Sequence, residues 1–322
     1  MNFIDAARVH RLLAFPMLVD ALAEAHREPE PIVERSLLVD PDGASGRCFL
    51  NLPAWQPGTA FGIKMITVQP ANRARNLPSV NAVYQLFDGE TGVPTLTIEG
   101  ESLTFRKTAA DSALGARFLA REGAATLLMV GAGALAPYIV RAHLALRASL
   151  ARVLVWNRTH EGAEALADTL AAEGIAATAV TNLESAVREA DLISCATMAT
   201  EPLVRGEWLK PGAHVDLVGG FTPQMRECDD GTVSRASLFV DSRQSTIDCV
   251  GDITAPMASG AITEEDILAD LYQLCRGEHP GRRGSEEITV FKNGGGAHLD
   301  LFTAVFLERQ FAAESASAQV QA

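Results

Sequence analysis

The chain has 322 residues, of which 48% are hydrophobic and 21% are charged. This length and composition are typical of a soluble globular protein with one large domain or two compact ones. The formal net charge of −13 at pH 7 repels polyanions and anionic membrane surfaces, so we expect neither nucleic acid nor a membrane as a partner, and an anionic ligand would need a local concentration of Arg and Lys.

The cysteines and histidines show no pattern of a disulfide framework or a metal site. The five cysteines form no Cys-x-x-Cys pair, and the histidines are scattered without ligand spacing. The first residues lack the charge and apolar pattern of a signal peptide. No apolar run reaches the roughly 20 residues that a membrane-spanning helix requires. We therefore expect a cytoplasmic protein without a metal.

Up to about residue 121 the predicted elements are short and varied. A helix follows a possible cap at Asp5, and short apolar runs separated by Pro and Gly turns predict five strands. Apolar residues at helical spacing then predict a helix over 108–121. This pattern favours an α+β domain built on an antiparallel sheet. The five strands are 36–39, 48–52, 62–68, 83–87 and 94–99.

Beyond residue 122 strands and helices alternate regularly. Most of the predicted strands are followed by a helix-like segment, and such alternation favours an α/β domain with a doubly wound parallel sheet of the Rossmann type. The tail over 299–311 again has helical spacing, and we expect it to pack on the first domain. The expected domains are therefore 1–121 together with 299–322, and 122–298. The predicted strands are 126–130, 152–156, 176–180, 192–196, 214–217 and 238–240.

A glycine-containing turn lies between the first of these strands and the helix-like segment that follows. In this position, backbone N–H groups at the start of the helix can face a pyrophosphate. The turn therefore predicts a nicotinamide-dinucleotide site. Ala136 stands where the third glycine of the fingerprint often occurs, which the Gly/Ala form permits. The loop residues expected to contact the cofactor are Gly131, Ala132, Gly133, Ala134 and Leu135.

The end of the second strand predicts which cofactor is preferred. NAD enzymes usually place an Asp or Glu there against the ribose hydroxyls, whereas this chain has Asn157, Arg158 and Thr159. The planar guanidinium of Arg158 suits a phosphate, and its two neighbours offer neutral hydrogen-bonding groups. A solvated arginine with no ligand is the alternative interpretation. We expect NADPH as the cofactor, with NADH a weaker one.

Motifs spread over nearly the whole chain resemble the ornithine cyclodeaminase and mu-crystallin family. This resemblance implies a homodimer, and an activity among those of the family, which include an ornithine-cyclising deaminase, alanine dehydrogenases and reductases of cyclic ketimines. The segments that carry it are Gly62-Ile-Lys64, Gln69 to Ser79, Lys107 to Ala113, Gly131-Ala-Gly133, Gly219-Gly-Phe-Thr-Pro223 and Gly251-Asp252.

Positions that match the family's motifs imply roles for individual residues. Arg35 and Lys64 would hold the substrate carboxylate, and Ser79 would lie near the nicotinamide. Lys107 and Thr108 would lie between the substrate and the cofactor phosphates. Further expected cofactor contacts follow the later strands, at Ala196, Thr197, Met198, Gly219 and Phe221.

The sequence departs from the commonest family pattern at two of these positions. Lys107 stands where many relatives have Arg, so a bidentate clamp becomes a point charge. Phe221 stands where the cyclodeaminases place an Asp used in deamination, and a phenyl ring neither accepts a proton nor orients an ammonium group. Within the family, the segment from Thr222 to Glu227 resembles the ketimine-reductase branch.

The expected activity is therefore the reduction of Δ1-pyrroline-2-carboxylate to L-proline, with the six-membered Δ1-piperideine-2-carboxylate, reduced to L-pipecolate, as an open further substrate. Two alternatives remain, an NAD-dependent ornithine cyclodeaminase and a non-catalytic NADPH- and ligand-binding protein like mu-crystallin. The proton donor also stays open among Lys64, His298 and Asp300. Asp300 could instead act as a carboxylate at a helix start, and His298 as an ordinary histidine.

Overall fold

A computed structural model describes residues 2–320. The chain divides into two compact units, Met1–Lys107 with Gly296–Ala322 (unit 1) and Thr108–Gly295 (unit 2). The first boundary falls inside helix α3 (Gly100–Leu119) and not after residue 121, because this helix begins eight residues before the expected start at 108. The second boundary falls after 295 and not after 298. The side chain of Glu99 accepts hydrogen bonds from the amides of Glu101 and Ser102, which explains the early start of α3.

Unit 1 is built on a mostly antiparallel sheet in which all five predicted strands are present. Three of them are longer than expected, and two short strands, at the start of the chain and near residue 32, were not predicted. Among the strand pairs of unit 1 that the structure describes, only that of β1 with β7 is parallel. The order is β1 (Asn2–Ile4), β7 (Pro94–Glu99), β6 (Val80–Asp88), β5 (Ala60–Val68), β4 (Cys48–Gln56), β2 (Ile32–Val33), with β3 (Ser36–Val39) also paired to β4.

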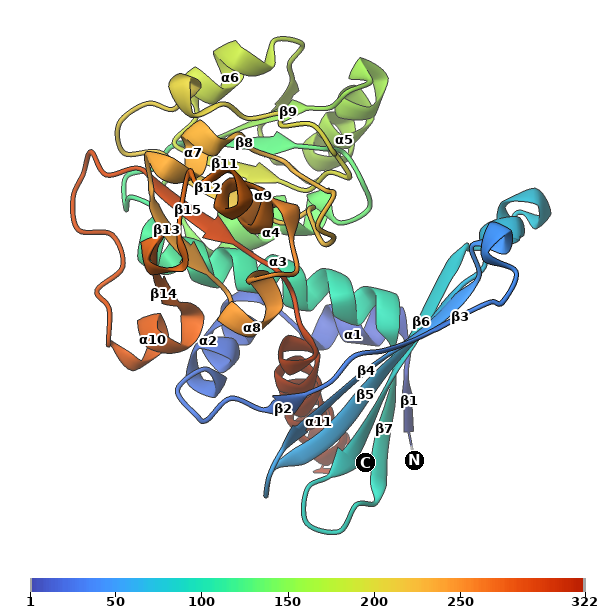
Figure 1. The fold of residues 1–322 in the computed structure, drawn as a ribbon. Coiled ribbons are helices and arrows are strands. Elements are labelled where there is room, and N and C mark those ends of the chain that lie inside the picture. Colours follow the sequence, from blue (N-terminus) through green and yellow to red (C-terminus); the bar gives the residue numbers. More distant parts are fainter. Residues whose placement is uncertain (1, 321–322) are drawn as a thin grey trace. The chain divides into compact units, whose positions relative to one another are not determined.

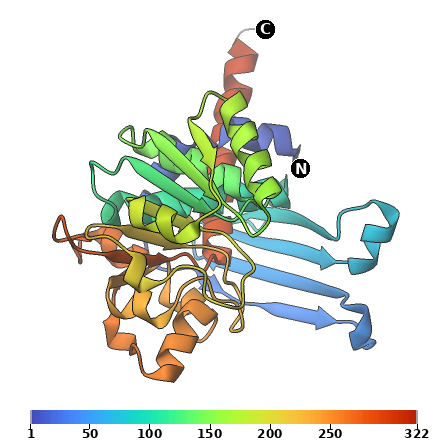
Figure 2. The ribbon, with the colours of Figure 1, turned by 90° about the horizontal axis from the view of Figure 1, so that it is seen from above.

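The C-terminal helix α11 (Ala297–Val320) covers one face of this sheet and contacts β4, β5 and β6 (Figure 1). It is longer than the helix predicted over 299–311. The N-terminal helices α1 (Ala6–Leu12) and α2 (Phe15–Ala25) contact it, and the carboxylate of Asp5 caps α1 as expected. The turns η1 (Gly43–Ser45) and η2 (Pro70–Arg75) join neighbouring strands at one end of the sheet, whose long strands lie side by side in Figure 2.

Unit 2 is an eight-stranded sheet in which every pair of strands is parallel. All six predicted strands are present, and β14 and β15 were not predicted. Chain order reverses between β8 and β11, which is the topological switch point where ligands bind in such sheets. The order is β10 (Ala177–Ala179), β9 (Arg152–Trp156), β8 (Thr126–Val130), β11 (Leu192–Cys195), β12 (His214–Leu217), β15 (Thr289–Lys292), β13 (Ser237–Val240), β14 (Ile267–Asp270).

Helices flank this sheet on both faces (Figure 1), because crossovers between parallel strands are right-handed and the chain winds in opposite directions from β8. No helix within residues 2–320 combines the length and apolar character needed to cross a bilayer. The remaining elements are α4 (Ala136–Leu146), α5 (His160–Ala172), α6 (Leu183–Glu189), η3 (Gly206–Trp208), α7 (Asp230–Ser234), α8 (Arg243–Thr246), α9 (Gly251–Ser259), η4 (Glu264–Asp266) and α10 (Leu271–Arg276).

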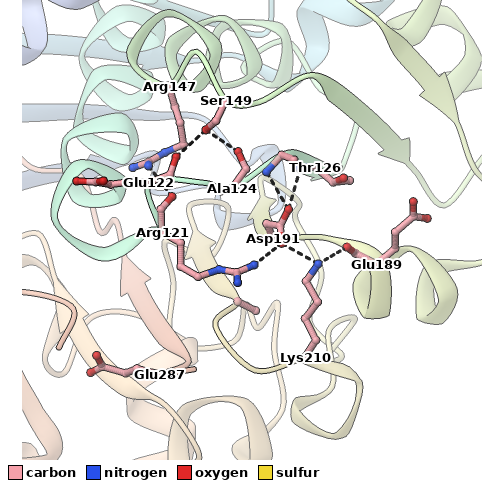
Figure 3. A network of polar contacts seen from close by, with 12 residues as sticks. Arg121, Glu122, Ala124, Thr126, Arg147, Ser149, Glu189, Asp191, Lys210 and Glu287 are labelled. Atoms are coloured by element: carbon pink, nitrogen blue, oxygen red, sulfur yellow. Dashed lines mark hydrogen bonds and ion pairs between the residues drawn. The ribbon is translucent and has the colours of Figure 1, made fainter. Parts of the chain in front are cut away.

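A polar network at the amino edge of this sheet holds β8 beside β11 (Figure 3). Asp191 accepts hydrogen bonds from the amides of Ala125 and Thr126 at 2.8 and 3.1 Å, and it pairs with Arg121 and Lys210 at 2.6 and 2.7 Å. Although burial opposes it, the hydrogen bonds from Lys210 and the two amides lower the pKa of Asp191 to about 2. The network lies at the edge opposite the switch point's ligand edge, so its role is structural.

Candidate active site

The glycine turn follows β8 at the carboxyl edge of the unit 2 sheet. Gly131 has a φ of 105°, which favours glycine, and a Cβ there would lie 2.6 Å from the carbonyl oxygen of Ala196. Gly133, in contrast, has no atom within 4 Å of the position of a Cβ. The first glycine therefore allows the turn to pack against the loop after β11, and the second leaves space above the turn.

The backbone amides of this turn are available to a ligand. Within residues 2–320, none of the amides of residues 132–135 donates a hydrogen bond, and α4 begins without a side-chain cap. Unpaired N–H groups at the start of a helix carry partial positive charge and bind phosphate oxygens. Ala134 and Leu135 belong to this run of amides, although their side chains do not line the adjoining pocket.

A pocket of about 480 Å³ adjoins the turn at this edge. Nine of the expected cofactor contacts line it, and Trp156 and the segment around Ala199 to Glu201 line it without having been predicted. Arg158 is exposed, and its side chain makes no hydrogen bond or ion pair within the described chain. The side-chain Nδ2 of Asn157 donates to the carbonyl and hydroxyl oxygens of Thr159, both at 3.0 Å. The nine residues are Gly131, Ala132, Gly133, Asn157, Arg158, Thr159, Ala196, Thr197 and Met198.

The buried carboxylate of Glu227 joins two loops of this edge. It accepts the amide and hydroxyl of Thr197 after β11, at 2.6 and 2.8 Å, and the amide of Gly219 after β12, at 2.7 Å. A Cβ at Gly219 would lie 2.0 Å from the carbonyl oxygen of Thr197, so only glycine fits there. Gly219 thus packs against the loop after β11 and does not itself line the pocket. Phe221, another expected contact, lies outside the lining and is 60% exposed.

An ion pair beneath these loops supports Glu227. Asp252 accepts the backbone amide of Glu227 at 2.7 Å and pairs with Lys292 at 3.1 Å, and all three residues are fully buried. Burial and the neighbouring Asp252 raise the pKa of Glu227 to about 7, against the opposing effect of Lys292. Asp252 therefore has a structural role in unit 2, and the parts that Glu227 and Lys292 play in this arrangement were not predicted from the sequence.

Strand register in unit 1 aligns three polar side chains on the face covered by α11. Ser36 pairs with Asn51 and Val33 with Ala54, so the same register places Arg35 opposite Leu52. Leu52 pairs with Lys64, and Lys64 pairs with Tyr84. Residues in one row of an antiparallel sheet share a face, and Arg35 is two strand spacings, about 10 Å, from Lys64. Arg35 is exposed and makes no side-chain hydrogen bond or ion pair within residues 2–320.

Lys64 meets Asp300 and Lys107 in the interior of unit 1. The Nζ of Lys64 lies 2.7 Å and that of Lys107 3.5 Å from Oδ2 of Asp300, and Lys107 also donates to the carbonyl of Gly296 at 3.1 Å. Within residues 2–320, Asp300 has these two ion pairs and no further partner, so its carboxylate keeps acceptor capacity. Burial lowers the pKa of Lys64 to about 8, and the charge of Lys107 adds to this while Asp300 opposes it.

His298 lies in the first turn of α11 but packs among aromatic rings. Its ring centroid is 5.8 Å from that of His26 and 5.9 Å from that of Phe302, in edge-on contacts. Burial, followed by the charges of His26 and Lys107, lowers the pKa of His298 well below its usual value. The imidazole is therefore neutral at neutral pH and does not carry an acidic proton for transfer.

Ser79 lies apart from the group of Lys64, Lys107 and Asp300, whereas Thr108 directly follows Lys107 in helix α3. Ser79 precedes β6 and is five residues from Tyr84 along the strand, which corresponds to roughly 17 Å. Thr108 begins unit 2, where its carbonyl accepts a hydrogen bond from Asn293 at 3.0 Å. Tyr84, by contrast, was not identified in the sequence although it is the direct cross-strand neighbour of Lys64. Within residues 2–320, no group of three His, Cys, Asp or Glu side chains could hold a metal ion.

Comparison with known sequences assigns this arrangement to a family. The profile of the ornithine cyclodeaminase/mu-crystallin family matches residues 13–314. The chain belongs to that family. Among its relatives, a Δ1-pyrroline-2-carboxylate reductase of Paracoccus denitrificans is 44% identical over 296 residues, which cover 91% of this chain and 92% of the relative. The predicted resemblance to the ornithine cyclodeaminase/mu-crystallin family is thus confirmed.

Solved structures of similar proteins extend this comparison to the fold. The Thermococcus litoralis Δ1-pyrroline-2-carboxylate reductase, solved with NADH and L-proline, has a TM-score of 0.90 at 28% identity and covers 98% of both chains. The iminosuccinate reductase of Paracoccus denitrificans, solved with NAD⁺, has a TM-score of 0.88 at 26% identity and covers 98% of this chain and 97% of that one. These likenesses confirm the predicted Rossmann-type fold of this ornithine cyclodeaminase/mu-crystallin family member.

Proposed function

We propose that this protein is an NADPH-dependent oxidoreductase that reduces the C=N bond of Δ1-pyrroline-2-carboxylate to give L-proline. The observation that carries the proposal is the buried group of Lys64, Lys107 and Asp300, in which two ammonium groups face one carboxylate. Its excess positive charge suits a small organic acid, and the depressed pKa of Lys64 suits proton transfer. The reductase names of the relatives from Paracoccus and Thermococcus support the same activity.

The substrate's carboxylate needs cations that are not already neutralised. Arg35 has no partner within the described chain and lies on the same face of the sheet as Lys64. Lys107 contributes a second positive charge, because Asp300 is shared between two lysines. We assign carboxylate binding to Arg35 and Lys107, which would orient the imine with its nitrogen toward Lys64.

The imine nitrogen must gain a proton before its carbon becomes a good hydride acceptor. Lys64 would donate this proton and become neutral, and Asp300 would then face the positive iminium. The proton transfer is balanced, since one ammonium is lost as one iminium forms. The cofactor, when bound, supplies the hydride that completes reduction of the C=N bond. We assign different roles to the two other candidate proton donors. Asp300 orients Lys64, and the neutral His298 is a packing residue.

The first test is cofactor oxidation by the purified protein. We expect absorbance of NADPH to fall when Δ1-pyrroline-2-carboxylate is added, with L-proline as the product by chromatography. The six-membered homologue, assayed in parallel, determines the ring-size preference. Release of ammonia from L-ornithine without net change of cofactor would instead establish a cyclodeaminase. Nucleotide binding without turnover of either cyclic imine would establish a binding protein.

Preference for NADPH over NADH rests on the end of β9. Arg158 lines the pocket and has no side-chain partner within residues 2–320, and the hydrogen bonds from Asn157 to Thr159 shape the turn that carries it. The start of α5, directly after Thr159, adds unpaired amides. Glu161 in the first turn of α5 would repel a phosphate, so the guanidinium of Arg158 is needed to offset it.

We expect Arg158→Ala to raise the KM for NADPH by about 10- to 100-fold, since it removes a hydrogen-bonded charge from the phosphate. The KM for NADH should change little, because that cofactor lacks the 2′-phosphate. Steady-state kinetics with both cofactors give the comparison, and Arg188→Ala, which alters an exposed arginine paired with Glu184 in the same unit, is the control. Equal losses with both cofactors would contradict the assignment.

The pH dependence tests Lys64 as the proton donor. The donor form exists below its pKa of about 8, so kcat/KM should fall as pH rises from 7 to about 10, approaching tenfold per pH unit above the pKa. Lys64→Met should lower kcat/KM by about 10²- to 10⁴-fold and remove this alkaline limb. Lys210→Met, which alters a lysine of the structural network, should retain it. An alkaline limb that persists in Lys64→Met would exclude Lys64 as its source.

We also propose a homodimer that uses the sheet face opposite α11. This face carries apolar residues where an exposed sheet face would be polar. Trp55 is 41% exposed and stacks on Phe61 at 5.2 Å between ring centroids, beside a groove of about 280 Å³ that Ile63 and Phe87 also line. An apolar surface of this kind marks a protein interface. The resemblance to the family, which implied a homodimer, agrees with this assignment.

We expect light scattering to give the mass of two chains for the native protein and of one chain for Phe61→Glu, because a carboxylate buried without a partner opposes association. Leu268→Glu, which places the same charge at a partly exposed position of unit 2, should leave the dimer intact. A native protein with the mass of one chain would refute the proposal.

A cytoplasmic location is the remaining part of this proposal. The five cysteines are free thiols. Proteins of a reducing compartment generally keep their cysteines in this form. Cell fractionation with antibody detection tests the location, and recovery of the protein outside the cytoplasmic fraction would contradict it.

A further inference from the structure

Tyr84 occupies a position next to the lysine that we propose as the proton donor. It lies on β6 directly opposite Lys64 on β5, and both side chains point to the face that α11 covers. Its side chain is fully buried. Because of this register, the Tyr84 side chain lies in the same cross-strand row as Lys64, in the interior of unit 1.

The sequence around Lys64 makes room for this phenol. A Cβ at Gly62 would lie 1.9 Å from the hydroxyl oxygen of Tyr84 and 2.5 Å from Cζ. Any other residue at 62 would therefore displace the ring. The Gly62-Ile-Lys64 motif thus combines the lysine with the one residue type that lets the tyrosine ring lie over the strand beside it.

The hydroxyl of Tyr84 has no hydrogen-bond partner within residues 2–320. A buried hydroxyl without a partner destabilises a folded protein, and buried tyrosines usually find one. Phenylalanine would fill the same volume without this cost. An unpaired phenol beside the Lys64 and Asp300 pair is thus the arrangement expected of a group that receives its partner from a ligand.

The charge of Asp300 indicates which group of the ligand approaches Tyr84. Burial and the nearby carboxylate of Asp300 raise the pKa of the Tyr84 phenol well above its usual value, so it stays protonated. Both oxygens of Asp300 also keep acceptor capacity. Asp300 attracts the protonated ring nitrogen, whose N–H can donate to the phenol oxygen, while Arg35 and Lys107 bind the carboxylate on the neighbouring carbon.

We propose that Tyr84 is a substrate-binding residue whose phenol oxygen accepts a hydrogen bond from the protonated ring nitrogen of a cyclic imine or secondary amine, next to Asp300. The inference rests on the proposed function and adds to it the recognition of the ligand's ring nitrogen. As Lys64 transfers its proton to the imine, the single N–H of the iminium is shared between the phenol oxygen and Asp300, and the ammonium of the L-proline product has one N–H for each. The phenol itself neither loses nor gains a proton.

Tyr84→Phe removes only the hydroxyl, and it should separate binding from stability. Because the hydroxyl has no partner in the free protein, we expect the melting temperature to be unchanged or higher. The affinity for L-proline should fall by about 10- to 100-fold, the size of a hydrogen bond to a charged group. Both kcat and kcat/KM for the cyclic imine should fall, because the contact strengthens as the nitrogen becomes charged.

Cyclopentanecarboxylate is the discriminating ligand, because it keeps the ring and the carboxylate but lacks the nitrogen. Calorimetric titration should give the same affinity for native protein and Tyr84→Phe. Tyr272→Phe, which changes a buried tyrosine of unit 2, is the matched control and should leave the L-proline affinity unchanged. If Tyr84→Phe weakened both ligands equally, lowered the melting temperature or left L-proline binding intact, the inference would be wrong.

Activity of the native protein distinguishes failure of this inference from failure of the proposed function. If the native protein reduces the cyclic imine and Tyr84→Phe behaves like it, only the role of Tyr84 is refuted. If the native protein neither reduces the imine nor binds L-proline, the proposed function fails, and the inference fails with it.

Discussion

The buried contact between Lys64 and Asp300 is the interaction on which the candidate site depends. Removing two charges from water is costly, and their attraction offsets this cost only when they remain close together. The pair therefore requires α11 to stay against β5, although the two residues are far apart in the sequence. This requirement explains why unit 1 is built from both ends of the chain.

The same burial provides the chemistry that we propose. In water a lysine remains protonated far above neutral pH and is a poor acid, whereas burial lowers the pKa of Lys64 to about 8. Lys107 adds a second positive charge and competes for the single carboxylate. The group thus combines attraction for an organic anion with a proton that can be transferred near neutral pH.

In unit 2 the pocket at the carboxyl edge of the sheet depends on backbone amides and on one buried carboxylate. The amides after Gly131 have no partner within the described residues, and Glu227 holds the loops after β11 and β12 by three hydrogen bonds. Such loops lie at the carboxyl edge of a parallel sheet, where the chain leaves each strand. A fixed carboxylate between two of them keeps the edge of the pocket in one shape, and this pre-organisation favours nucleotide binding.

Local patterns in the sequence determined most of the strands, the Rossmann-type unit, the glycine turn and the position of Arg158, because alternation, turn residues and short motifs act between near neighbours. They did not predict β15, a four-residue strand followed by glycines, whose place between β12 and β13 comes from sheet pairing. The local patterns also placed the end of the first unit at residue 121 and not at Lys107, because helix α3 continues across this boundary. Only the tertiary structure decided that Tyr84 lies beside Lys64 above Gly62, that Asp300 meets two lysines, and that Glu227 joins two loops. The physical reason is that strand register and the packing of distant segments set burial and charge contact, and these cannot be read from the spacing of residues along the chain.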